Sequence, residues 1–309
     1  MSIFWLILIP SLVYFVILSI SSLSAMFSER AGIVNVGIEG MIIIGATFYG
    51  IFGQIFKVSS PWMQIPLFLI AALAGGLFSM LHGFVTIKLK GDHTISGIAL
   101  NLLAPAIAIF VLKRFGNANK IQSSVQELAL SQNSINDWQN IISLKLLIVI
   151  LVFVTAIILM NKTKWGLRFK AIGENPQAAD AAGINVNFFK WQGVIISGIL
   201  AGLAGGVLFQ QKGVSFSGSA DGMGFVALTI LIMGRWKSSL ILVFALFFSL
   251  ILGLASVIGT GAGIFETVKE YGKLINTIPY ILTFVVLIFS SKRVQGPAAA
   301  GQPYDKSKR

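Results

Sequence analysis

The residues of this chain best placed to do chemistry lie in a glycine-punctuated run between positions 29 and 41. The run reads Glu-Arg-Ala-Gly-Ile-Val-Asn-Val-Gly-Ile-Glu-Gly-Met and sets Asn35 and Glu39 within otherwise apolar sequence. A carboxylate near the centre of a bilayer costs roughly 3 kcal/mol, so it normally faces a protein interior or a water-filled cavity. The pattern therefore predicts a polar pathway for a small-molecule solute. The alternative is that Glu39 reaches the surface or pairs with a Lys or Arg for packing alone.

Two further residues, Asn101 and Phe225, extend the expected pathway beyond this pair. If the run is helical, Asn35 and Glu39 share one face because they are four residues apart. Asn101 lies within another apolar run, where its amide can bond either a solute or a neighbouring helix. Phe225 suits stacking on a flat solute or packing against lipid. Asp221, directly before the short run that contains Phe225, is expected to cap the N-terminus of that element.

Composition sets the class of protein and excludes several functions. The chain is 56% hydrophobic and 11% charged, with a mean hydropathy of +0.86, whereas a soluble domain carries roughly a quarter charged residues. The net charge of +12 comes from short loops and the tail, not from a patch interleaved with aromatic residues, so no nucleic acid partner is expected. The sequence has no cysteine, and its two histidines lack partners at metal-ligand spacing. We expect no metal and no cofactor.

The hydropathy pattern predicts an all-α polytopic membrane protein with about 8–10 transmembrane helices, some of them discontinuous. One transmembrane domain over residues 1–293 accounts for nearly the whole chain. Gly198, Gly202 and Gly206 are spaced for close helix packing within one apolar run. The candidate runs are 3–26, 31–56, 62–88, 94–114, 142–161, 188–210, 222–234, 238–258 and 276–291. The candidates for a discontinuous or re-entrant element are 31–56, which glycines interrupt, and the short run 222–234.

The distribution of basic residues predicts how the chain is oriented in a cell membrane. With the N-terminus outside, 15 of the 23 Lys and Arg fall on the cytoplasmic side, as the positive-inside rule favours. Residues 116–141 then form an external loop. The segment 294–309 becomes a cytoplasmic tail, whose small, Gly, Pro and charged residues are typical of disorder.

The longest cytoplasmic loop, residues 161–187, contains a short helix with clear boundaries. Asn175 is suited to the N-cap and Pro176 to the first helical position, and Gly183 is suited to end the helix. The Ala-rich stretch offers little bulky apolar surface to lipid headgroups, so docking on another protein is favoured over resting on the membrane. The residues expected at this contact are Gly173, Glu174, Asn175, Ala178, Ala179, Ala182 and Gly183.

Four motifs together resemble one branch of the permease subunits of binding-protein-dependent ABC importers. The loop sequence Gly173-Glu-Asn-Pro-Gln-Ala-Ala-Asp-Ala-Ala-Gly is similar to the coupling loop of these subunits. Ile95-Ser-Gly-Ile-Ala-Leu-Asn and Gly224-Phe-Val-Ala-Leu-Thr-Ile-Leu-Ile-Met-Gly-Arg-Trp, with the run at 29–41, resemble the branch that imports branched-chain amino acids, simple sugars and nucleosides. The run at 29–41 most resembles nucleoside permeases. Asp92-His93 departs from the family pattern.

The resemblance implies a transmembrane permease that takes up nucleosides and is energised by separate ABC ATPase subunits. It also implies a second permease subunit and an extracytoplasmic solute-binding protein. The sequence contains no phosphate-binding loop, nucleophile elbow or paired-carboxylate site, so we expect neither an enzyme nor catalytic residues. Two alternatives stay open: an ABC permease for simple sugars or branched-chain amino acids, and an ion-coupled secondary transporter that uses Glu39 as its relay.

Overall fold

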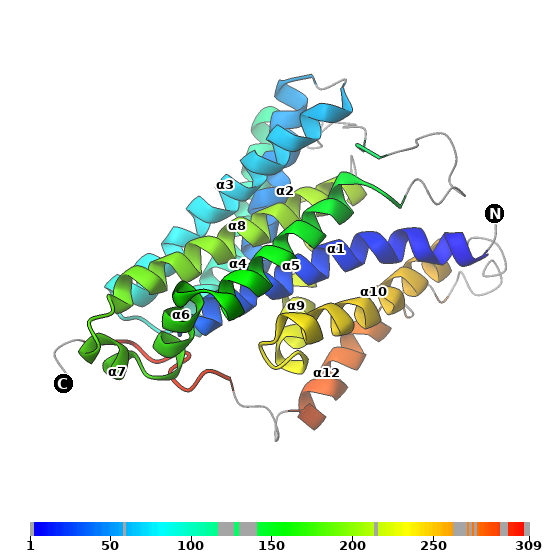
Figure 1. The fold of residues 1–309 in the computed structure, drawn as a ribbon. Coiled ribbons are helices and arrows are strands. Elements are labelled where there is room, and N and C mark those ends of the chain that lie inside the picture. The colour runs from blue at the N-terminus through cyan, green and yellow to red at the C-terminus, as the bar shows by residue number, and fades with distance from the viewer. Residues whose placement is uncertain are drawn as a thin grey trace.

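Two long helices, α1 (Ile3–Arg30) and α8 (Val186–Lys212), run through the middle of the bundle and organise the helices around them (Figure 1). The computed structural model describes residues 3–57, 60–116, 127–129, 141–212, 216–261, 271, 274, 277–290 and 296–305. The other elements are α2 (Ile38–Ile55), η1 (Pro61–Met63), α3 (Gln64–Gly83), η2 (Phe84–Lys88), α4 (His93–Phe115), α5 (Leu144–Lys162), α6 (Lys164–Glu174), α7 (Pro176–Ala181), α9 (Met223–Met233), α10 (Ser238–Thr260) and α12 (Ile278–Ser290).

The helical content confirms the predicted all-α membrane fold. Within the described residues, seven helical segments are long and apolar enough to cross a membrane. The remaining two expected runs are shorter: α9 has 11 residues and α12 has 13. At 1.5 Å per residue, α9 is about 16 Å long, roughly half the thickness of a hydrocarbon core. The expectation of a discontinuous element at 222–234 agrees with this length.

The run at 31–56 is not helical throughout. Residues 31–37 form turns and extended backbone, and helix α2 begins only at Ile38. Asn35 and Glu39 would share one face only if this run were helical, and that condition is not met because only Glu39 lies in the helix. The buried loop at 31–37 needs hydrogen-bond partners from other elements, which determine much of the site described below.

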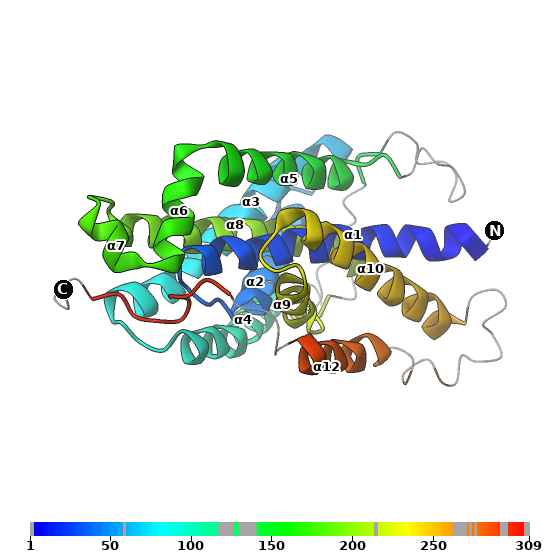
Figure 2. The same ribbon diagram turned by 60° about the horizontal axis from the view of Figure 1, so that its bottom comes forward.

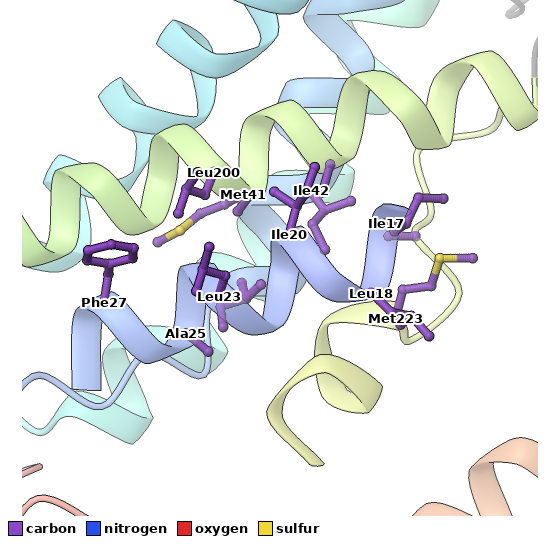
Figure 3. Close-up of a cluster of buried hydrophobic side chains, with 14 of the residues drawn as sticks. Ile17, Leu18, Ile20, Leu23, Ala25, Phe27, Met41, Ile42, Leu200 and Met223 are labelled. Carbon is purple, nitrogen blue, oxygen red and sulfur yellow. The ribbon is translucent and has the colours of Figure 1, made fainter. Parts of the chain in front are cut away.

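Small residues bring α8 close to α2 and α3, as the glycine spacing predicted. A Cβ on Gly202 would meet the backbone of Ala71, and one on Gly45 would meet the backbone of Gly202. Close approach of this kind is the usual basis of helix association in membranes. On the neighbouring face, Leu23, Met41 and Leu200 lie together where α1, α2 and α8 meet (Figure 3).

The tail is ordered where the structure describes it, so the predicted disorder was wrong for residues 296–305. The Ala299 N–H donates to the Gly173 carbonyl at 2.9 Å, and the Gly301 N–H donates to the Gly32 carbonyl at 3.2 Å. Asp305 forms an ion pair with Lys90 at 3.0 Å. The tail packs against the end of the bundle opposite to the start of α1 (Figure 2). Residues 306–309 lie outside the described part.

Candidate functional site

Glu39 caps the N-terminus of α9. Its Oε1 accepts a hydrogen bond from the Gly222 N–H at 2.8 Å, and its Oε2 accepts one from the Gly224 N–H at 2.6 Å. The first N–H groups of a helix have no partner within the helix and attract negative charge. Glu39, which is only 8% exposed, satisfies two of these groups at the start of α9. Its carboxylate therefore fixes the short helix to the first turn of α2.

These bonds correct two expectations about charged groups. Glu39 does not reach the surface, and the bonds it makes are to backbone N–H groups; Arg30 instead donates to the Trp236 carbonyl and lies 3.6 Å from Glu174. Asp221 does not cap α9, because the N-cap residue is Gly222, with a φ of 78°. The Asp221 carboxylate pairs with Lys212 at 2.6 Å.

Asn101 secures the start of α2 from the neighbouring helix α4. Its Oδ1 accepts a hydrogen bond from the Gly40 N–H at 2.9 Å, and its Nδ2 donates to the Val36 carbonyl at 2.9 Å. The amide therefore satisfies an unpaired donor of the first helical turn and an acceptor of the preceding loop. The sequence left open whether the Asn101 amide bonds a solute or a neighbouring helix, and these contacts are of the second kind.

Asn35 is enclosed between the loop at 31–37 and α8. Its Nδ2 donates to the Ser197 Oγ at 2.9 Å, and its Oδ1 accepts from the Gly37 N–H at 3.1 Å. The Ser197 hydroxyl also lies 3.0 Å from the Ser24 hydroxyl of α1. Because Asn35 has no exposed surface, its polar groups serve this internal network.

Two histidines hold the same loop from α3 and α4. His82 Nε2 lies 3.0 Å from the Val34 carbonyl, and His82 Nδ1 lies 2.9 Å from the Ser96 hydroxyl. The Val34 N–H donates to His93 Nδ1 at 3.2 Å. The sequence showed no role for these residues beyond a lack of metal-ligand spacing. His82 is a polar side chain within the apolar run 62–88 and His93 directly precedes the run 94–114, and neither position identifies a partner. In the described part of the chain, no group of three or more His, Cys, Asp or Glu is placed to hold a metal ion.

A cavity of about 440 Å³ adjoins the N-terminus of α9. Its walls come from α1, α9, α10 and α12, the helices that surround this region in Figure 2. The Tyr280 hydroxyl donates to the Asp221 carbonyl at 2.5 Å and so fixes α12 to the turn before α9. The chemically active lining consists of two phenols, a carboxylate and two hydroxyls, from Tyr14, Tyr280, Asp221, Ser256 and Thr260.

The four expected pathway residues are distributed unevenly about this cavity. Glu39 caps α9, whose first residue Met223 lines the cavity, whereas Asn35 and Asn101 bond to the loop at 31–37, α8 and the start of α2. Phe225 is half exposed on α9 and is not part of the cavity lining. The sequence missed the tyrosines, because a Tyr near an apolar run is compatible with many surface positions.

The short helix in the loop at 161–187 forms as predicted. The Asn175 Oδ1 accepts a hydrogen bond from the Ala178 N–H at 2.9 Å, and Pro176 occupies the first turn. Gly183 ends the element with a φ of 80°. Of the seven residues expected at a partner contact, Gly173 and Ala179 are buried and the other five are exposed.

This segment is attached to the end of α1 and to the tail. Gly173 packs so closely on the Arg30 backbone that a Cβ would collide with the Arg30 carbonyl. Glu174 lies 3.6 Å from the Arg30 guanidinium and accepts a hydrogen bond from the Ala298 N–H at 3.2 Å. Helix α1 contacts both α6, which leads into this segment, and α9.

Comparisons with known proteins agree with the membrane fold. The sequence model of a family described as "Branched-chain amino acid transport system / permease component" matches residues 7–291. The nucleoside ABC transporter permease protein NupC of Lactococcus lactis is 38% identical, over 96% of each chain. The guanosine ABC transporter permease protein NupQ of Bacillus subtilis is 37% identical, over 98% of each chain. The putative glucose ABC transporter permease protein TsgC13 of Haloferax volcanii is 28% identical, over 94% of each chain. No solved structure shows a significant match.

Proposed function

This chain belongs to the family of permease components of branched-chain amino acid transport systems, and within it we propose a membrane permease subunit of an ABC importer that takes up nucleosides. The observation that carries the choice of solute is the similarity to a nucleoside and a guanosine permease over nearly the full length of each chain. The putative glucose permease is 28% identical, so it supports the same class of transporter. Because this identity is lower than that of the two nucleoside permeases, a sugar is less favoured as the solute than a nucleoside.

The chemistry of the cavity beside α9 supports a neutral solute with a flat ring. A nucleoside requires hydrogen-bond partners for its ribose hydroxyls and an apolar surface for its base. Tyr14 and Tyr280 offer rings, and Asp221, Ser256 and Thr260 offer oxygen atoms. A free amino acid requires a charged partner for its carboxylate, and among the described residues no Lys or Arg lines this cavity.

The pathway residues expected from the sequence take two roles in this proposal. Glu39, Asn35 and Asn101 hold the starts of α2 and α9 in position, since their polar groups are engaged by protein atoms. Phe225 contributes an exposed ring on α9 to the pathway. The paired bonds on Glu39 make it a poor proton relay, which disfavours an ion-coupled secondary transporter.

The energy for transport comes from separate ATPase subunits, because the chain has no phosphate-binding loop of its own. We assign the exposed residues of the segment at 173–183 to the contact with these subunits. A second permease subunit completes the pathway, and a solute-binding protein delivers the nucleoside on the outer side. The N-terminus lies outside and the tail lies in the cytoplasm, as the positive-inside rule favours. The transmembrane domain covers residues 1–293.

The experiment is uptake by the assembled importer in proteoliposomes, with its ATPase and solute-binding protein. We expect ATP-dependent uptake of labelled uridine, adenosine or guanosine, and little uptake of glucose or leucine. Uptake of leucine or glucose without any nucleoside would refute the substrate but not the permease. Uptake driven by an ion gradient in the absence of ATP would refute the ABC mechanism.

A further inference from the structure

A second cavity, of about 320 Å³, lies at the end of the bundle where α1, α5, α6 and α10 meet. Three basic side chains from three of these helices or their boundaries line it: Arg30, Lys170 and Lys237. Asn161, Ser238 and Ser239 add uncharged hydrogen-bonding groups. The proposed function gives this cavity no role.

The positive charge in this cavity is poorly neutralised. Within the described part of the chain, no carboxylate belongs to its lining. Glu174 lies 3.6 Å from Arg30, in a pair whose acidic partner is half exposed, and such pairs contribute little. The Glu29 carboxylate accepts a hydrogen bond from the Trp236 indole N–H at 2.7 Å. Burial and the nearby Arg30 charge lower the pKa of Lys170, which is the response of a cation placed beside another cation.

The start of α10 adds backbone donors to the same cavity. Ser238 and Ser239 begin this 23-residue helix, and its N-cap residue Lys237 makes no side-chain capping bond. The first N–H groups of a helix favour an anion. The free N–H groups at the start of α10 and the three basic side chains therefore favour an anion bound in this cavity.

The rest of the lining is apolar and continues into the exposed surface of α5. Met26, Ile157 and Met160 form part of the cavity wall. Along α5, Leu147, Leu151 and Ile158 are each at least half exposed, as expected of side chains that face lipid. A ligand that fits both parts has an anionic head and a hydrocarbon body.

We propose that this cavity binds the phosphate group of an anionic phospholipid, with its acyl chains along α5 and α10. Basic pockets between transmembrane helices at the cytoplasmic side are known to bind such headgroups. The apolar wall distinguishes a lipid from free phosphate and from an acidic side chain of a partner subunit. The proposal does not depend on which solute the permease carries.

The test uses the full-length chain in detergent, with phosphatidylglycerol and phosphatidylcholine as probes. Native mass spectrometry and thermal unfolding measure how each lipid binds and stabilises the protein. The double variant Lys170→Gln/Lys237→Gln removes two cations, and Lys88→Gln/Lys164→Gln is the matched control with exposed lysines outside the cavity. We expect phosphatidylglycerol to bind the wild type and the control alike and to bind the double variant at least about tenfold more weakly.

Several outcomes would overturn the proposal. Equal affinity for the two lipids, or an equal loss in the control variant, would show that the cavity does not recognise the headgroup. Full displacement of phosphatidylglycerol by millimolar inorganic phosphate would assign the cavity to a free anion. Unchanged phosphatidylglycerol binding in the double variant would show that Lys170 and Lys237 do not hold the headgroup.

Discussion

Glu39 and Gly224 are 185 residues apart in the chain, yet the Glu39 Oε2 accepts a 2.6 Å hydrogen bond from the Gly224 N–H. The contact is close enough that a Cβ on Gly224 would lie 2.5 Å from the Glu39 backbone nitrogen. The Glu39 carboxylate therefore joins the starts of α2 and α9, and the absence of a side chain at Gly224 allows them to approach closely. This junction lies next to Asp221 and Met223, which line the cavity, and it joins the start of α9 to the start of α2.

Glu39→Gln should weaken this junction without changing which solutes compete. In a Gln side chain at position 39, the amide oxygen can accept one of the two N–H bonds, from Gly222 or Gly224. The NH₂ group then faces the other N–H and cannot accept from it. Leaving one buried donor unsatisfied costs about 1–3 kcal/mol. We expect a lower unfolding temperature in detergent and several-fold slower uptake, with an unchanged order of competing nucleosides.

Asp221→Asn is the stability control for this prediction, and because Asp221 lines the cavity its competition profile does not serve as a reference. It alters the carboxylate next to Gly222 but leaves both Glu39 bonds in place. Its ion pair with Lys212 is half exposed on the acidic side, so its loss should cost at most about 1 kcal/mol. A shifted competition profile in Glu39→Gln would place Glu39 in contact with solute and contradict the structural role.

Asn101→Asp should destabilise the start of α2. The carboxylate can still accept the Gly40 N–H, but it has no donor for the Val36 carbonyl and repels it. The cost should be about 1–3 kcal/mol, measured as a lower unfolding temperature. Phe225→Leu, at a half-exposed position, should change stability by no more than about 0.5 kcal/mol. Equal unfolding temperatures for Asn101→Asp and wild type would disprove the bridging role.

The sequence predicted those features that depend on local pattern. Apolar runs longer than about 18 residues located the long helices, since hydropathy alone decides which segments enter a membrane. The ends of the short helix followed from Asn175, Pro176 and Gly183, because capping involves only near neighbours.

Long-range partners were not predictable in the same way. The partner of Glu39 depends on how α2 meets α9, and no spacing in the sequence encodes it. The glycines of the run at 29–41 suit a turn and a small-residue helix equally, so the start of α2 was misplaced. The tail binds through backbone groups of Ala299 and Gly301, which a composition typical of disorder does not exclude.

Truncation of the tail should loosen the segment at 173–183. Removing residues 296–309 deletes the bonds from Ala298 and Ala299 to Glu174 and Gly173, whereas removing only 306–309 keeps them. We expect faster amide hydrogen exchange over 171–183 and lower uptake in the longer truncation alone. Identical exchange in the two truncations would show that the tail does not stabilise this segment.

The ion pair at the end of the tail should matter less than its backbone bonds. Lys90 and Asp305 are both partly exposed, and such pairs contribute about 0–1 kcal/mol. Lys90→Ala should therefore leave exchange over 171–183 close to that of the wild type. An effect as large as the truncation would mean that the charge, and not the backbone, holds the tail in place.

Gly183→Val and Gly183→Asn together test whether the end of the short helix couples the permease to its ATPase. Gly183 has a φ of 80°, and an added Cβ would meet no atom within 4 Å, so any cost comes from the backbone. A β-branched residue loses roughly 1–2 kcal/mol in this conformation, while Asn tolerates it. We expect normal membrane insertion of both variants. Transport-linked ATP hydrolysis should fall in the Val variant and be largely retained in the Asn variant. Full coupling in correctly inserted Gly183→Val would exclude this helix end from the coupling contact.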